Sequence, residues 1–182
     1  MRIPVLLAAG LMLSISFTAV PLLTQTLGLE QTEFSAEDEA AKKPAKIPDD
    51  VLALLRQDDR VKSALEDGKI PPGELPTSWF SASAIHLSGP GEPDFIVAGQ
   101  GPLKGEVVEG FWIFCHTEHG YKLALKAPAH NLVVTETYWN GYREIELSTE
   151  VANVLTSVFF RWDGKKYEYV DFQEKSHKLQ SR

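Results

Sequence analysis

The 182-residue sequence contains a single cysteine, Cys115, and this scarcity excludes two common ways of stabilising a small domain. One thiol cannot form a disulfide within the chain, and it cannot supply the several ligands of a cysteine-rich zinc site. Cys115 lies within an apolar run, so we interpret it as a small core residue. Basic residues are also scarce, because 18 Lys and Arg stand against 25 Asp and Glu, a net charge of −7. Such an acidic chain repels phosphates, so we expect no nucleic-acid partner.

Catalytic motifs are absent as well. The sequence contains no nucleophile elbow, and Ser81, Ser83 and Ser88 have only His86 nearby as a base. Glycines are concentrated at residues 99–105, but no helical pattern follows them to present backbone amides to a phosphate. We therefore expect a protein that is not an enzyme and that holds no cofactor.

The longest apolar run covers residues 3–23 and follows Met1 and the single positive charge of Arg2. This order is typical of a secretory signal. The 21 residues of the run are also enough to span a bilayer, and no clean Ala-x-Ala cleavage site follows. Residues 1–26 are therefore either a signal peptide, which we favour, or an N-terminal membrane anchor. In both cases we expect an exported protein, periplasmic or extracellular.

Two segments separate this run from the rest of the chain. Residues 27–47 are polar and charged and lack the apolar side chains of a core, which predicts a disordered acidic tether. Apolar residues then recur at near-helical spacing: Val51, Leu54, Leu55, Val61 and Leu65. Asp58 or Asp59 can cap a second helix, so residues 48–76 predict a helical segment, divided near Asp58, followed by a proline-rich connector. Its apolar face should cover the β-layers.

The following region, residues 79–172, contains one pattern twice. The aligned segments are 91–97 with 141–147 at an offset of 50, and 111–115 with 157–161 and 120–125 with 166–170 at an offset of 46. One more apolar run precedes each copy, at 84–87 and at 132–135, which makes four runs per copy. The runs are rich in Val, Ile, Phe, Tyr and Trp and are bounded by Gly, Pro, Asn and Asp, as strands and turns are. We predict a duplicated β domain.

The arrangement of the two copies follows from the most apolar run, 111–115, which has no polar face and should be covered on both sides. We therefore predict a mainly β fold with one N-terminal helical segment, in which two tandem four-stranded antiparallel units pack as a compact sandwich or a two-blade propeller-like domain. Two blades cannot close a propeller, so the sandwich is the simpler form. The hydrophilic residues 173–182 predict a flexible tail.

The turn between the first two runs of each copy approaches the pattern Asp-x-Asn-x-Asp-Gly-x-x-Asp. The residues that fit are Gly91 and Asp94 in the first copy and Glu136, Asn140, Gly141 and Glu144 in the second. The chain thus resembles degenerate FG-GAP or VCBS-type repeats of integrin-like β-propellers, many of which bind calcium through this loop. It is also similar to exported bacterial proteins that share an Asn-Gly-Tyr-Arg-Asp/Glu run. These resemblances imply a β-repeat fold and export. They imply no particular activity.

The calcium loop itself is incomplete in both copies. Calcium needs six to eight oxygen ligands, and His86 and Pro90 occupy ligand positions of the first loop. We expect that loop to be a metal-free turn. Tyr138 occupies a ligand position of the second loop, where the sequence leaves metal binding open.

The run from Cys115 to His119 is the alternative place for a metal. On an extended strand, Cys115 and His119 share one face while His116 lies on the other, so no three ligands converge locally. A site built from His116 and His119 would need His130 to complete it through the fold. A metal-binding protein that uses these three histidines is therefore one alternative function.

The strongest candidate for binding is the turn around Asn140. Five residues form it: Tyr138, Trp139, Asn140, Tyr142 and Arg143. Aromatic side chains with Asn and Arg nearby are typical of contacts with proteins or glycans. We predict a non-enzymatic binding module that recognises a protein or glycan through this loop. A structural envelope protein that assembles through exposed strand edges is the other alternative, and the sequence leaves the oligomeric state open.

Overall fold

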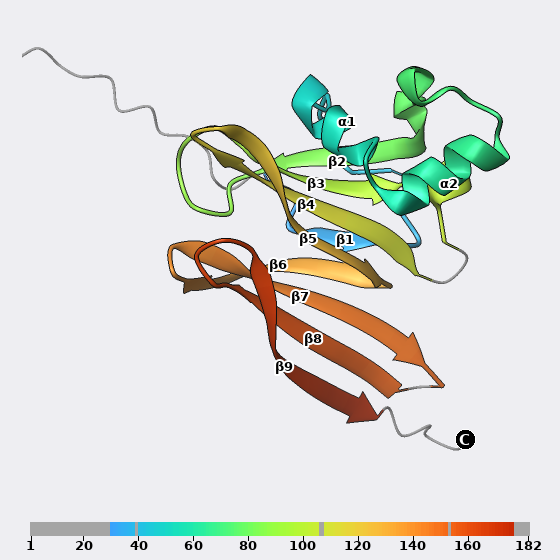
Figure 1. Ribbon diagram of the computed structural model, residues 1–182. Coiled ribbons are helices and arrows are strands. Elements are labelled where there is room, and N and C mark those ends of the chain that lie inside the picture. The colour runs from blue at the N-terminus through green and yellow to red at the C-terminus, as the bar shows by residue number, and fades with distance from the viewer. Residues whose placement is uncertain (1–29, 39, 106–107, 153, 177–182) are drawn as a thin grey trace, which may run out of the picture.

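The computed structural model describes residues 30–38, 40–105, 108–152 and 154–176, whose arrangement is shown in Figure 1. The predicted signal peptide or anchor, residues 1–26, lies outside this part of the chain. Among the described residues, no helix is both long enough and apolar enough to cross a membrane.

The described residues form nine strands in two antiparallel sheets. The smaller sheet has the spatial order β2 (Phe80–Ile85), β3 (Asp94–Gly99), β4 (Glu109–Thr117) and β5 (Gly120–Ala129). The larger sheet has the order β1 (Glu33–Ser35), β6 (Asn131–Trp139), β7 (Tyr142–Val151), β8 (Val154–Trp162) and β9 (Tyr167–Ser176). The other elements are the helices α1 (Asp49–Leu55) and α2 (Asp59–Asp67) and the short 3-10 turns η2 (Pro72–Glu74), η3 (Thr77–Trp79) and η4 (Gly101–Leu103). The predicted fold class, mainly β with an N-terminal helical segment, is confirmed.

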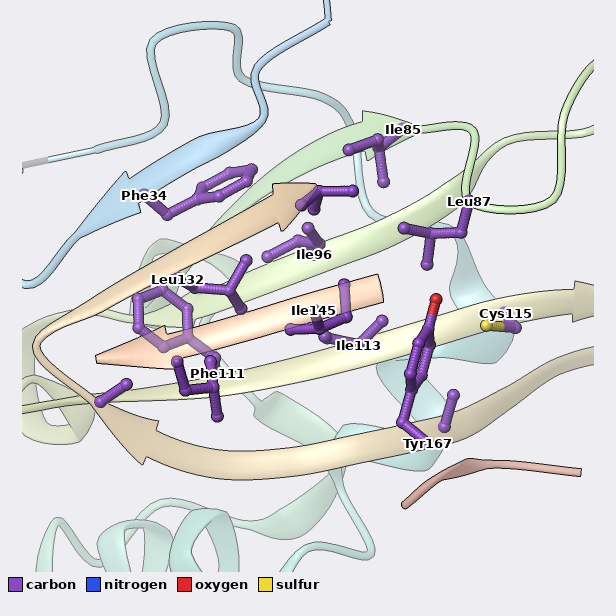
Figure 2. Close-up of a cluster of buried hydrophobic side chains, with 14 of the residues drawn as sticks. Phe34, Ile85, Leu87, Ile96, Phe111, Ile113, Cys115, Leu132, Ile145 and Tyr167 are labelled. Atoms are coloured by element: carbon purple, nitrogen blue, oxygen red, sulfur yellow. The ribbon is translucent and has the colours of Figure 1, made fainter. Parts of the chain in front are cut away.

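These elements form three layers: the helices, the smaller sheet and the larger sheet (Figure 1). Strand β4 lies in the middle layer and is buried on both faces. Phe111 and Ile113 point into the core between the sheets, which Figure 2 shows, whereas Trp112 and Phe114 point into a second core under the helices. The prediction that this strand is covered on both sides is confirmed. Among the described residues, no strand or helix covers the other face of the larger sheet (Figure 1).

The two predicted four-stranded units are present as β2–β5 and β6–β9, and their registers correspond. Equivalent cross-strand pairs are Phe95–Phe114 and Ile145–Phe160, Ile113–Leu125 and Phe159–Asp171, and His116–Tyr121 and Trp162–Tyr167. Each unit also has a bulge at the same place in its last hairpin, where Ala124 and Val170 are the extra residues. The corresponding residues of the two units are 50 or 46 positions apart, as in the sequence alignment. The sequence repeat is therefore also a repeat of the structure.

Side-chain hydrogen bonds repeat as well. The hydroxyl of Tyr121 donates to the carbonyl of Pro93 at 2.9 Å, and that of Tyr167 donates to the carbonyl of Arg143 at 2.7 Å. Pro93 and Arg143 are themselves 50 residues apart. In each unit, the tyrosine at the start of the last strand is therefore hydrogen-bonded to the backbone at the start of the second strand.

The helical segment is divided at Asp58, as the sequence predicts. The Oδ1 atom of Asp58 accepts the backbone N–H groups of Arg60 (2.9 Å) and Val61 (3.4 Å), which caps α2. Val51, Leu55 and Val61 are buried against the smaller sheet.

Two predicted segments differ from the structure. Residues 30–38 and 40–47 are not a disordered tether: β1 pairs with β6, Phe34 is buried between the sheets, and the N–H of Ala45 donates to Ala82. Backbone hydrogen bonds and two buried apolar side chains, Phe34 and Ile47, order a segment whose composition is polar. Strand β9 continues to Ser176, so the predicted tail is partly a strand, while residues 177–182 and 27–29 lie outside the described part.

Candidate interaction surface on the larger sheet

The turn that carries the predicted binding residues is a tight hairpin between β6 and β7. Asn140 (φ 48°) and Gly141 (φ 83°) both have positive φ, as a two-residue hairpin turn with the twist of the strands requires. The side-chain amide of Asn140 donates to the carbonyl of Trp162 at 2.8 Å. Asn140 therefore fixes this turn to the β8–β9 hairpin.

Tyr142 belongs to the edge of the core. Its ring stacks on Trp162 with the centroids 4.1 Å apart, and Trp162 is itself buried against Tyr167. Burial raises the pKa of the Tyr142 hydroxyl above its ordinary value. The side chain is half-buried and its stacked face is not available to a ligand.

Arg143 is the most deeply engaged of the five predicted residues. Its guanidinium donates to the carbonyls of Thr135 (2.9 Å) and Val134 (3.2 Å) and pairs with Glu136 at 2.6 Å. It also lies 3.7 Å from Glu30 in the segment that precedes β1. With its side chain 6% exposed, Arg143 connects parts of the fold and is not a contact residue.

Glu30 also holds His86, which follows β2. The Glu30 carboxylate accepts hydrogen bonds from the Nδ1 and the backbone N–H of His86. The other ring nitrogen lies 3.2 Å from the carbonyl of Gly91, and Asp94 adds its charge nearby. The hydrogen bond with Glu30, opposed by burial and assisted by these neighbours, raises the pKa of His86 above 6.5.

This raised pKa predicts a pH dependence of stability. The protonated His86 is favoured in the folded state, so its stabilisation is complete below pH 6.5 and is lost as the pH rises through the raised pKa. We expect the difference in unfolding free energy between the wild type and His86→Gln to shrink over that rise. Urea denaturation of both proteins from pH 5 to pH 9 measures it, and a difference that stays constant or grows with pH would refute the assignment.

Three of the five predicted residues are exposed: Tyr138, Trp139 and Asn140. Tyr138 and Trp139 are 53% and 41% exposed, and the guanidinium carbon of Arg161 lies 3.9 Å above the Trp139 ring. The Nε of Arg161 donates to Glu144 at 2.6 Å, which holds the guanidinium in place. Because Phe160 and Trp162 pack toward the core, Arg161 between them points to the uncovered face of the larger sheet. Tyr138 precedes Trp139 on β6 and pairs across the ladder with Arg143, so its side chain lies on the other face of the sheet. We call Trp139, Arg161 and Glu144 the aromatic cluster.

Exposed apolar side chains are concentrated on the same sheet. Of the large apolar side chains recorded as exposed in the described chain, only Leu123 lies on the smaller sheet. The others lie on strands of the larger sheet: Tyr138, Trp139, Val151, Tyr169, Val170 and Phe172. The larger sheet is thus the side of the molecule with the surface composition of an interface.

The candidate metal ligands do not come together. His116 packs its ring against Tyr121, and His119 lies in the exposed turn between β4 and β5, beside Glu118. His130 follows the far end of β5, where it lies 3.5 Å from Glu37. In the part of the chain that the structure describes, no group of three or more His, Cys, Asp or Glu side chains could hold a metal ion.

The acids at the calcium-loop positions are turned toward the protein. Asp94 is buried and its carboxylate accepts the backbone N–H groups of Leu87 and His116, both at 2.9 Å, while burial raises its pKa. Glu136 and Glu144 pair with the arginines already described. These side chains fasten turns and strands. Burial likewise raises the pKa of the Cys115 thiol, which keeps it protonated and unreactive.

A cleft on the opposite side of the molecule contains a buried carboxylate, that of Asp58, yet its oxygen atoms are already used. Between the helices and β5, the Oδ2 of Asp58 accepts the indole N–H of Trp112 at 2.9 Å and pairs with Lys126 at 2.7 Å. Burial opposes ionisation of Asp58, but these bonds keep its pKa below its usual value. Since the other oxygen caps α2, this carboxylate serves the fold.

Arg161 and Glu144 are the site residues that sequence reasoning missed. Ile145 and Phe160 are cross-strand partners in β7 and β8. Glu144 precedes Ile145 and Arg161 follows Phe160, so the two charged side chains lie next to this pair and meet each other. The repeat alignment places both strands, but only the register between them shows that the two charges meet. Comparison of the chain with protein-family models, with curated proteins and with solved structures finds no match. Function is therefore argued from this surface alone.

Proposed function

We propose that the protein is an exported, non-enzymatic binding module that recognises a partner protein through the uncovered face of its larger sheet. The aromatic cluster supports this function most directly, because the large aromatic side chain of Trp139 is exposed beside an arginine that is already held in place. Trp, Tyr and Arg are the residue types that contribute most to binding energy at protein interfaces.

A protein is a better match than a glycan for this cluster. Sugar rings stack on an open aromatic face, whereas the guanidinium of Arg161 covers one face of Trp139 at 3.9 Å. Pairing with Glu144 restrains Arg161 before binding, which reduces the conformational entropy lost when a partner immobilises it. Tyr138, which is exposed at the same end of the β6–β7 hairpin, adds a second rigid anchor with a polar tip.

Trp139→Ala and Tyr138→Ala should weaken binding of the partner by about 30-fold each, the size of an interface hot spot. Proteins captured from the envelope of the producing cell by the wild type and by each variant are compared by quantitative mass spectrometry, and the affinity is then titrated with the purified partner. Val151→Ala is the matched control, because Val151 is 67% exposed on β7 and lies outside the cluster.

Two results would contradict the proposal. The first is a partner that binds the Trp139 and Tyr138 variants as well as it binds the wild type. The second is binding that disappears when the partner is enzymatically deglycosylated, since the cluster would then recognise a glycan.

A further inference from the structure

The four edges of the two sheets are protected to very different degrees. Strand β1 offers only three residues, and β2 is covered by the segment before α1, where the N–H of Ala45 donates to Ala82 and the N–H of Ala41 to the Ser81 hydroxyl. The β5 edge lies against α1, whose Asp50 accepts the backbone N–H of Tyr121. Strand β9 has ten residues and, among the described residues, no strand or helix along its outer side (Figure 1).

Strand β9 also exposes three large apolar side chains. Tyr169, Val170 and Phe172 are 56%, 42% and 55% exposed. Tyr169 and Phe172 face Phe160 and Val158 across the ladder, so both lie on the core side of the sheet, beyond the part that the smaller sheet covers. An edge strand with unpaired backbone groups and apolar side chains is a template for an added strand.

The repeat provides an internal comparison, because β5 is the counterpart of β9 at an offset of 46. Where β5 carries Lys122, Lys126 and Pro128, β9 carries Glu168, Phe172 and Glu174. Lysine and proline are residues that block pairing at an edge, and β9 has neither of them at these three positions. The same building block thus ends one sheet with a closed edge and the other with an open, acidic one.

The negative charge of β9 favours a positively charged strand at this edge. Glu168, Asp171 and Glu174 outweigh Lys175, the one basic residue of β9. Asp171 also protects the backbone, since its carboxylate accepts the N–H of Phe172 at 2.8 Å. An incoming strand must displace that carboxylate, and a lysine or arginine on the strand would pair with it once it is released.

A second copy of the chain fits this edge poorly. Each copy carries a net charge of −7, and pairing β9 with β9 places acidic strips side by side. The lysines of the β5 edge cannot supply the complement, because Lys126 pairs with Asp58 and Lys122 lies 4.7 Å over the Trp162 ring.

We propose that β9 is a docking edge that accepts an extended, positively charged segment of another protein as a sixth strand of the larger sheet. Apolar residues of that segment pack beside Tyr169 and Phe172 on the core side, and alternate basic residues lie beside Glu168 and Asp171 on the uncovered face. This site adjoins the aromatic cluster, because Glu168 faces Arg161 across the ladder of β8 and β9, but it does not use Trp139.

The test uses a synthetic eight-residue peptide of alternating lysine and valine, acetylated and amidated at its ends, titrated into the full chain by fluorescence anisotropy. We expect saturable binding that is at least about 10-fold weaker for a peptide with glutamate in place of lysine. The same loss is expected when alternate backbone amides of the lysine peptide are methylated, because strand addition needs those N–H groups. Hydrogen exchange should slow in β9 on binding, including at Phe172.

Matched variants locate the site. Asp171→Lys should weaken the lysine peptide at least about 10-fold, whereas Glu150→Lys, the same charge change at an exposed position of β7, should have little effect. Trp139→Ala should leave peptide binding unchanged, which separates this proposal from the one above. Equal binding of the methylated peptide, or protection outside β9, would overturn the docking edge. Sedimentation showing a dimer that Phe172→Pro abolishes would also overturn it, because β9 would then be occupied by a second copy.

Discussion

Replacing Trp112 by alanine is expected to destabilise the protein by about 4 kcal/mol, the usual cost of emptying a tryptophan site in a core. Trp112 is 1% exposed, packs edge-on against Phe80 at 6.1 Å, and donates its indole N–H to Asp58. Its loss leaves a large cavity between the helices and the smaller sheet. Chemical denaturation followed by circular dichroism measures the change.

Two control variants separate the contributions to this loss. Trp112→Phe keeps most of the ring and removes the indole donor, so it should cost less than Trp112→Ala, since Asp58 retains Lys126. Trp139→Ala removes the same side chain from the exposed cluster and should cost less than about 1 kcal/mol. Similar destabilisation by Trp112→Ala and Trp139→Ala would contradict the placement of one in the core and the other on the surface.

Arg143→Met is the second large expected effect, about 3 kcal/mol of lost stability, because breaking a buried ion pair leaves its partners without compensation. The carbonyls of Thr135 and Val134 lose their donor, and the Glu30 carboxylate, 15% exposed, loses a nearby positive charge. Hydrogen exchange should also quicken in β1, because Glu30 precedes this strand. Denaturation midpoints and exchange rates check both results.

The control for Arg143 is an ion pair on the surface. Lys166 and Glu168 lie 3.0 Å apart and both are more than half exposed, so Lys166→Met should leave the denaturation midpoint nearly unchanged. If Arg143→Met instead proved neutral for stability but abolished binding of a partner, Arg143 would be a contact residue, as the sequence alone suggested.

Much of the fold could be predicted because it depends on local patterns. Turn glycines, apolar runs and the tyrosines Tyr121 and Tyr167 recur at fixed offsets, and each lies in the element that its neighbours in sequence determine. The division of the helices at Asp58 follows from the same kind of signal, a side chain that caps the backbone amides two and three residues further on.

The features that could not be predicted depend on partners far apart in the sequence. Residues 30–47 look disordered by composition, yet β6 and Ala82 supply backbone bonds that composition does not reveal. Arg143 resembles a surface residue until Glu30 is brought beside it. Of the predicted binding loop, Tyr138, Trp139 and Asn140 are exposed, and the register of β7 and β8 brings Arg161 over Trp139.

The two sheets thus have different roles, the smaller one buried between two layers and the larger one presenting an open face and an open edge. A photoreactive amino acid placed singly at Trp139, Val170 and Leu123 in the producing cell tests this difference. Val170 and Leu123 are equally exposed, at 42%, on the larger and smaller sheet. Cross-links to partner proteins from Trp139 and Val170, with few from Leu123, are the predicted result. Cross-links that form mainly from Leu123 would show that partners bind the other side of the molecule.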